Sequence, residues 1–196
     1  MTDISNKIYS RVKSIIDTWN EPDIYAISFF VYANESYEYK DHKNVSYFAV
    51  SYNTESDCMG ADIYSEEHWN YAFWRQEENP IIDPCEPNEL TELLFQWYKE
   101  NGITDIGKED EDCYDENCNY IGKGPVGHYE LVQIVAEVAK KLQTEGYVNA
   151  GFCKKIPIII HGLEYAWYDI EATKKANSDS EADTFFKAMR ELGIID

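Results

Sequence analysis

The stretch that decides the fold is DIYAISFFVYA, residues 23–33. β-Branched and aromatic side chains dominate it, and it contains no glycine or proline, so it predicts a central β-strand. The polar residues 34–44 predict a long turn. After this turn, VSYFAVSYN at 45–53 alternates apolar and polar side chains well enough to be an antiparallel partner. The two segments together predict a β-hairpin.

The sequence also predicts strands and helices before and after this hairpin. KKIPIIIHG at 154–162 predicts another buried strand, and residues 61–64 predict a short one. HWNYAFWRQ at 68–76 fits either a strand or a helical turn. Apolar residues at helical spacing, with proline near the starts and glycine after the ends, predict helices at 4–18, 87–102, 127–146 and 163–177, and a last helix after Asn177.

The domain organisation follows from length and patterning. We expect one α+β domain over residues 1–196, with a mostly antiparallel sheet and helices packed against it, because no internal repeat or flexible linker divides the sequence. No stretch approaches the roughly 20 consecutive apolar residues of a membrane-spanning helix, and the first ten residues lack the apolar core of a signal peptide. The sequence therefore predicts a cytoplasmic protein.

The acidic residues are unevenly distributed. The chain has 17 basic and 37 acidic residues, a net charge of −20, and residues 55–116 alone hold 19 acidic and 3 basic residues, a net charge of −16. A concentrated negative surface repels phosphate backbones and anionic lipids, so we expect neither nucleic-acid nor membrane binding. The charge favours a basic protein partner, although acidity that serves solubility alone also explains it.

The cysteines and the acidic run raise the question of a metal site. Five cysteines without a secretion signal predict reduced thiols. Cys113 and Cys118 with His128 form a candidate metal set, but recognised zinc sites have tighter paired spacings. The run that contains Asp110 and Asp112 lacks the third ligand and the central glycine of a calcium loop. We therefore expect an acidic solvated loop, with no metal and no cofactor.

The aromatic residues point to an interface. Sixteen tyrosines and five tryptophans exceed what a core of this size ordinarily needs, and many lie beside carboxylates. Tyrosine and tryptophan offer large, rigid contact areas and are enriched at protein interfaces, although half-buried packing is the alternative. On the interface hypothesis the contact residues are Trp69, Trp74, Glu77, Asp110, Asp112 and Tyr114.

A rival hypothesis is enzymatic. His161 and Glu164 follow a predicted strand, and a turn at Gly162 would let them meet as a base and its orienting carboxylate, with Asp169 nearby. The alternative is a hydrogen-bonded histidine at a strand end. The sequence has no nucleophile elbow, paired-histidine zinc motif, phosphate-binding glycine loop or CxxC. A small hydrolase or metal-dependent enzyme is thus the alternative function.

Several short motifs resemble a known family. They are YAISFFVY at 25–32, SYNTE at 51–55, HWNYAFW at 68–74, KKIPIIIHGLEY at 154–165 and KKAN at 174–177. Together they resemble a bacterial domain-of-unknown-function family of acidic, cytosolic proteins of similar length. That family is associated with the neighbourhoods of polymorphic-toxin immunity genes, alongside SUKH-like proteins that bind and block toxins. The resemblance implies an immunity protein that neutralises a basic toxin such as a nuclease, and marks His161, Glu164 and Tyr165 as a shared structural or binding position.

Overall fold

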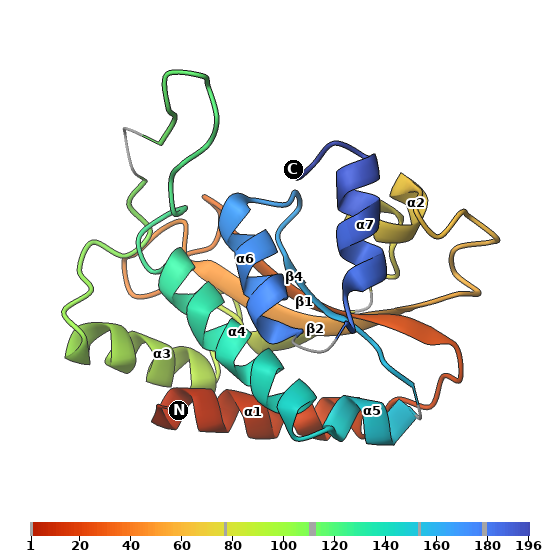
Figure 1. Cartoon of the computed structure of the whole chain (residues 1–196). Helices are drawn as coiled ribbons and strands as arrows, with labels where there is room; N and C mark the ends of the chain where they lie inside the picture. Colours follow the sequence, from red (N-terminus) through yellow and green to blue (C-terminus); the bar gives the residue numbers. More distant parts are fainter. Residues whose placement is uncertain (1, 77, 110–112, 153, 178–179) are drawn as a thin grey trace.

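A four-stranded sheet forms the centre of the computed structural model (Figure 1), which describes residues 2–76, 78–109, 113–152, 154–177 and 180–196. Its order is β3-β2-β1-β4, with β1 at Ile24–Ala33, β2 at Ser46–Thr54, β3 at Asn79–Ile82 and β4 at Ile158–His161. The pairs β1–β2 and β2–β3 are antiparallel, and β1–β4 is parallel. The sheet is therefore mostly antiparallel, as expected, but the carboxyl ends of β1 and β4 lie at the same edge.

The hairpin predicted from the sequence is confirmed. β1 and β2 pair from Ile24 opposite Thr54 to Ala33 opposite Ser46, with one irregularity near the start of β1. The first eight residues of β1 are all buried. Because other elements cover both faces of β1, its sequence is a continuous apolar run rather than an alternation. This explains why β1 could be recognised as a central strand.

Four longer helices cover one face of the sheet. They are α1 (Asp3–Ile16), α3 (Glu89–Glu100), α4 (His128–Thr144) and α6 (Trp167–Ala176). Their buried side chains join Ile27, Phe29 and Val31 of β1 in the larger of two hydrophobic cores. α5 (Tyr147–Phe152) follows α4, and α6 packs against both α4 and β4. The helices expected from spacing in these regions are confirmed to within a few residues.

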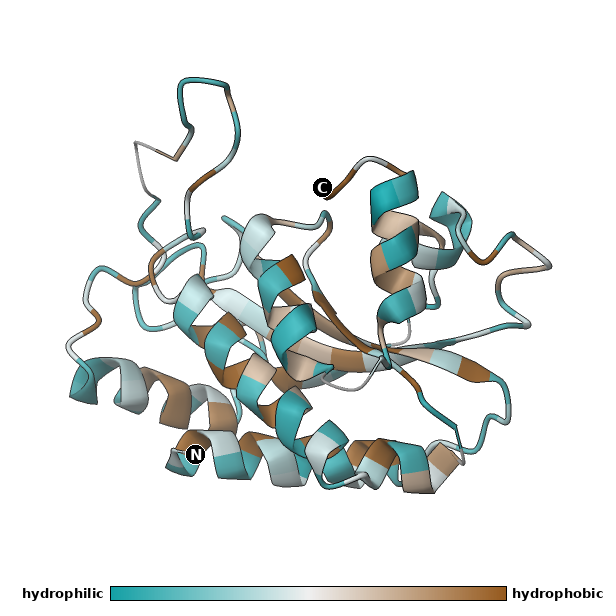
Figure 2. Cartoon of the chain, viewed as in Figure 1, coloured by the Kyte–Doolittle hydropathy of each residue, from teal (hydrophilic) through white to brown (hydrophobic). Residues whose placement is uncertain are grey.

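Short elements and one longer helix cover the opposite face. They are α2 (Glu66–Trp69), the 3-10 helix η1 (Tyr71–Phe73) and α7 (Asp183–Glu191). In this second core, Trp69, Trp74 and Phe185 pack with Phe30 and Ile159 of the sheet. Figure 2 shows the mainly hydrophobic strands between helices that carry hydrophobic and hydrophilic residues on different sides. None of the helices in the described ranges is both long and apolar enough to cross a membrane.

The differences from the sequence prediction concern short elements. Residues 61–64 adopt turns and irregular backbone, so the predicted short strand is wrong. β3 and α5 were not predicted, because each is very short and β3 contains Pro80. Proline is tolerated there because β3 lies at the edge of the sheet, where an N–H donor is not needed on the outer side.

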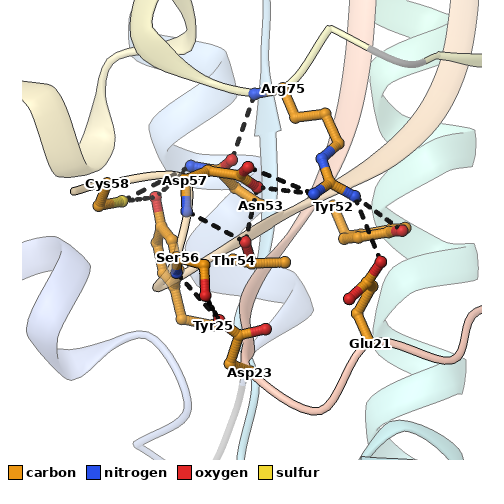
Figure 3. A network of polar contacts seen from close by, with 10 residues as sticks. All are labelled: Glu21, Asp23, Tyr25, Tyr52, Asn53, Thr54, Ser56, Asp57, Cys58 and Arg75. Atoms are coloured by element: carbon orange, nitrogen blue, oxygen red, sulfur yellow. Dashed lines mark hydrogen bonds and ion pairs between the residues drawn. The ribbon is translucent and has the colours of Figure 1, made fainter.

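A polar network fastens the segment after η1 to the sheet (Figure 3). The Arg75 guanidinium donates to the Asp57 carboxylate at 3.2 Å and to the Tyr52 hydroxyl at 3.0 Å. The Arg75 backbone N–H donates to Asn53 Oδ1 at 3.2 Å, and the Asn53 amide donates to the Tyr25 hydroxyl at 2.7 Å. Through these contacts, one residue connects the covering segment with β1 and β2.

Replacing Arg75 with methionine should lower the free energy of unfolding by about 1–2 kcal/mol, because charge-assisted hydrogen bonds are lost while the apolar stem is kept. Urea denaturation measures the loss. The control is Arg11→Met at an exposed position of α1, which should change stability by less than about 0.5 kcal/mol. Equal losses in the two variants would contradict an anchoring role for Arg75.

Candidate functional site

The candidate site is a cavity at the carboxyl ends of β1 and β4. Its volume is about 490 Å³, within the range of roughly 300–1,000 Å³ that small-molecule sites occupy. It is lined by residues 31–33 of β1, by the turn 162–166 after β4, and by the first residues of α4 and α6. As in open α/β sheets, a crevice forms where adjacent parallel strands end. We call it the β1–β4 cavity.

The lining of the β1–β4 cavity is aromatic and acidic. Its carboxyl groups belong to Glu109, Glu164 and Asp169, and none of the lining residues in the described part of the chain is lysine or arginine. His128 contributes one ring, and the others come from Tyr32, Tyr114, Tyr120, Tyr165 and Tyr168. Carboxylates and the faces of aromatic rings both attract positive charge. This composition therefore favours a cationic ligand.

Asp169 differs from the other two acidic residues of the lining in its burial, which sets its protonation state. Its side chain is only 2% exposed, and Oδ2 accepts the Ala166 backbone N–H at 3.0 Å. Oδ1 has no hydrogen-bond partner among the residues that the structure describes. Burial raises the pKa of Asp169 to about 8, against the opposing effect of the backbone N–H groups of Ala166 and Gly162. Asp169 is therefore mostly protonated near neutral pH.

The local sequence explains why a carboxyl group sits there. Asp169 is the third residue of α6, where a carboxylate reaches back to the backbone N–H at the helix start. The helix dipole at this position favours the ionised form by about 0.3–1 kcal/mol, and by up to about 2 kcal/mol at best. Burial of an unpaired charge costs more than that, so burial decides the protonation state.

His128 is the second buried titratable group of the cavity. It is the first residue of α4, and its Nδ1 lies 2.9 Å from Ser46 Oγ of β2. Burial lowers the pKa of His128 to about 4, so the ring is neutral. The Gly124 backbone crosses this ring so closely that an added Cβ would lie 2.9 Å from His128 Cδ2. Glycine is therefore needed at this position, which also has a φ of +73°.

An acidic arm, residues 113–122, contributes part of the lining and projects from the body of the molecule (Figure 1). Tyr114 and Tyr120 pair in an isolated β-bridge, with their ring centroids 5.5 Å apart. The Trp167 indole N–H donates to the Gly122 carbonyl at 2.8 Å and ties the arm to α6. Tyr114 remains 64% exposed.

The structure changes the set of contact residues expected from the sequence. Trp69 and Trp74 are only 2% and 5% exposed, and their indole N–H groups donate to the Ile63 and His68 carbonyls. Their prediction as contact residues is therefore wrong, because both rings are needed to cover the second face of the sheet. Tyr114 is exposed at the cavity. Glu77, Asp110 and Asp112 lie outside the described residues.

The predicted pairing of His161 with Glu164 is also wrong. His161 is 1% exposed, its Nε2 lies 2.8 Å from Ser28 Oγ, and its Nδ1 lies 2.8 Å from the Gly162 carbonyl oxygen. Side chains alternate along β4, so the ring of His161 faces the second core, whereas α6 with Asp169 packs with the first core. Burial lowers the pKa of His161 to about 4. It is a neutral histidine of the core.

No metal centre is evident in the described ranges. There, no group of three or more histidine, cysteine, aspartate and glutamate side chains could hold a metal ion. Cys113, Cys118 and His128 thus do not form the metal set considered from their spacing. The three carboxyl groups that line the β1–β4 cavity do not form such a group either.

Sequence reasoning named Asp169 and Tyr114 separately but missed the cavity that brings them together. The cavity exists because β4 runs parallel to β1, and no local sequence pattern sets the direction of a strand beyond the hairpin. One signal was present, since residues 158–161 follow the longest helix, and a strand that returns after a helical crossover can pair in parallel.

Comparison with known proteins adds no assignment. No family model, no curated protein and no solved structure matches the chain significantly. The resemblance to the immunity-associated family therefore stays an expectation.

Proposed function

We propose that this chain is an acidic protein-binding module that docks a basic protein partner. The supporting observation is that exposed apolar side chains lie around two adjoining cavities, the β1–β4 cavity and a cavity of about 330 Å³ beside α2 and the end of α7. The two cavities share residues 163–165. We call the exposed apolar set around them the docking surface: Tyr114, Leu163, Leu192 and Ile194.

The docking surface combines the two properties that a basic protein would recognise. Its apolar side chains lie in the open, and Figure 2 shows the hydrophobic C-terminal segment that carries Ile194. Contiguous exposed apolar groups commonly mark interaction sites. Glu66, Glu109 and Glu164 line the same two cavities. Complementary charge would accelerate encounter, and apolar anchors would supply much of the affinity.

The finer form of this proposal is an immunity protein that neutralises a basic toxin such as a nuclease. An acidic protein that covers a basic, nucleic-acid-binding surface would block access of the phosphate backbone. The family resemblance supports this identity of the partner. A gene for a large secreted toxin next to the gene for this chain would add independent support.

The experiment captures a partner on the tagged protein from its native cells and identifies it. We expect a basic protein whose binding weakens as salt rises, because salt screens charges beyond about 10 Å at 0.1 M ionic strength. The double variant Tyr114→Ser/Leu163→Ser should weaken binding of the purified partner at least about tenfold. The matched control is Met59→Ser/Phe73→Ser, two exposed apolar residues that line neither cavity.

Binding that is unchanged in Tyr114→Ser/Leu163→Ser, or equally weakened in the control, would contradict the docking surface. A captured protein that is acidic, or whose binding does not depend on salt, would contradict the charge complementarity.

A further inference from the structure

We infer that the β1–β4 cavity binds the guanidinium group of an arginine side chain of the basic partner, with Asp169 as its counter-ion. The inference deepens the proposed function and rests on it for the source of the cation. The site itself stands on the geometry of the cavity: a carboxyl group that is almost wholly buried, with an unpartnered oxygen, among tyrosine rings.

The unpartnered oxygen points to a missing ligand. A buried polar atom without a hydrogen bond costs free energy, and in native proteins most such atoms have partners. Asp169 Oδ2 accepts the Ala166 backbone N–H, and the Gly162 backbone N–H also favours the carboxylate. Even so, no group among the described residues makes a hydrogen bond of ordinary geometry to Oδ1. A donor that enters the cavity would satisfy it.

The lining selects the charge of that donor. Helices α4 and α6 begin at the cavity, and helix N-termini by themselves favour anions. However, Glu109 and Glu164 also line the cavity, and the described lining holds no lysine or arginine to neutralise them. An anion would therefore meet two carboxylates and no basic side chain in the described lining. A metal ion is disfavoured as well, because the carboxyl groups do not form a metal-binding cluster in the described ranges.

A guanidinium group fits this lining better than an ammonium group. Its planar fork can donate two parallel hydrogen bonds to one carboxylate, and its flat face can stack on aromatic rings. Asp169 Oδ1 is available to accept one of these hydrogen bonds, and tyrosine and histidine rings line the same cavity. The neutral state of His128 matters here, since a protonated imidazole would repel the cation.

Binding should be coupled to the loss of a proton. The titratable groups that line the cavity together with Asp169 are Glu109 of the loop after α3, His128 of α4, Glu164 of the turn after β4, and Tyr32, Tyr114, Tyr120, Tyr165 and Tyr168. The Tyr165 hydroxyl is engaged elsewhere, since it donates to the Trp69 carbonyl at 2.5 Å. In the free protein, burial keeps Asp169 mostly protonated near neutral pH. The arriving cation favours the carboxylate, so binding near pH 7 should release about one proton. Below pH 8 the affinity should then rise up to about tenfold per pH unit.

The test is calorimetric titration of the full chain with Nα-acetyl-L-arginine amide, compared with Nα-acetyl-L-citrulline amide, a neutral analogue of nearly the same shape. We expect measurable binding of the arginine compound only. Its affinity should rise about tenfold between pH 6 and pH 7, and its enthalpy should depend on the buffer by an amount that corresponds to about one proton released.

Variants locate the site. Asp169→Asn should weaken binding of the arginine compound at least about tenfold. Glu137→Gln, at an exposed position of α4 that does not line the cavity, should leave it unchanged. Unfolding curves of both variants check that they are folded.

The outcomes separate this inference from the proposed function. Equal binding of citrulline and arginine compounds, or no binding of either, overturns the inference even if a basic partner is captured on the docking surface. Binding of spermidine or choline more than about tenfold tighter than that of the arginine compound overturns the partner side chain as the source of the cation. If the arginine compound binds but no basic partner is captured, the guanidinium site in the β1–β4 cavity remains supported. Only the proposed function is then contradicted.

Discussion

The variant Asp169→Asn is expected to be more stable than the natural protein, by about 2–4 kcal/mol near pH 7. The reason is the raised pKa of about 8, compared with 3.8 for an ordinary aspartate. Between these two values the folded chain holds a proton that the unfolded chain has released, so stability falls as pH rises through this window. Asparagine keeps the shape of the protonated acid and removes this loss.

The pH dependence makes this prediction specific. The gain from Asp169→Asn should be small near pH 4 and grow by up to about 1.4 kcal/mol per pH unit until about pH 8. Urea denaturation at pH 5 and near pH 7.5 measures it. Glu137→Gln in α4, the helix that packs against α6, is the control, because the Glu137 side chain is exposed. A destabilised Asp169→Asn, or a gain independent of pH, would show that Asp169 is ionised and satisfied in the folded protein.

A residue that lowers the stability of the fold and lies in a cavity is better explained by a role in ligand binding than by a role in folding. Most substitutions destabilise proteins, and where a substitution stabilises a destabilised site, the recurrent cost is lost function. Asp169 fits this description, since it could be replaced by asparagine without disturbing the backbone contact to Ala166. Its unpartnered oxygen is thus better explained by a ligand than by packing.

The second large effect is a loss of stability in acid, caused by two buried histidines. Burial lowers the pKa values of His128 and His161 from 6.5 to about 4. The unfolded chain therefore binds protons between about pH 6.5 and pH 4 that the folded chain does not, and stability is lost as pH falls through this window. Together the two histidines should remove about 3–4 kcal/mol between pH 7 and pH 5.

Asp169 masks this loss in the natural protein, because its own contribution has the opposite sign over the same range. The measurement therefore uses Asp169→Asn as the background and compares urea denaturation at pH 7 and pH 5. Adding His128→Gln and His161→Gln, which keep a side-chain group able to reach Ser46 and Ser28, should remove most of the difference. His68, whose pKa burial also lowers, should leave a smaller remainder of the same sign.

If the stability lost between pH 7 and pH 5 is unchanged when His128 and His161 are replaced, the two histidines do not cause that loss. A natural protein whose stability falls by the whole amount between pH 7 and pH 5 would also contradict this account, since Asp169 would then not be protonated in the folded state.

The sequence predicted the elements well where local signals are strong. Residues 23–33 and 45–53 were predicted as strands, and they form β1 and β2, because β-branched and aromatic side chains dominate both segments and most of their residues are buried. The helices α1, α3, α4 and α6 were also predicted, since their apolar residues repeat at helical spacing. The α+β class follows from these elements.

Side-chain environment was harder to predict. Trp69 and Trp74 lie among carboxylates in the sequence, but they are buried because α2, η1 and α7 pack on the second face of the sheet, which no local sequence pattern predicts. His161 and Glu164 are close in sequence but point apart, because the side chain of a strand residue follows the alternation of the strand. The β1–β4 cavity depends on strand direction, which is a property of the whole fold.

Carbon-13 NMR titration of the Asp169 carboxyl group, with and without saturating Nα-acetyl-L-arginine amide, tests the proposed guanidinium site at its central residue. We expect a pKa near 8 in the free protein and a marked decrease when the arginine compound is bound. A pKa near 4 in the free protein, or a pKa that the arginine compound does not change, would contradict Asp169 as the counter-ion.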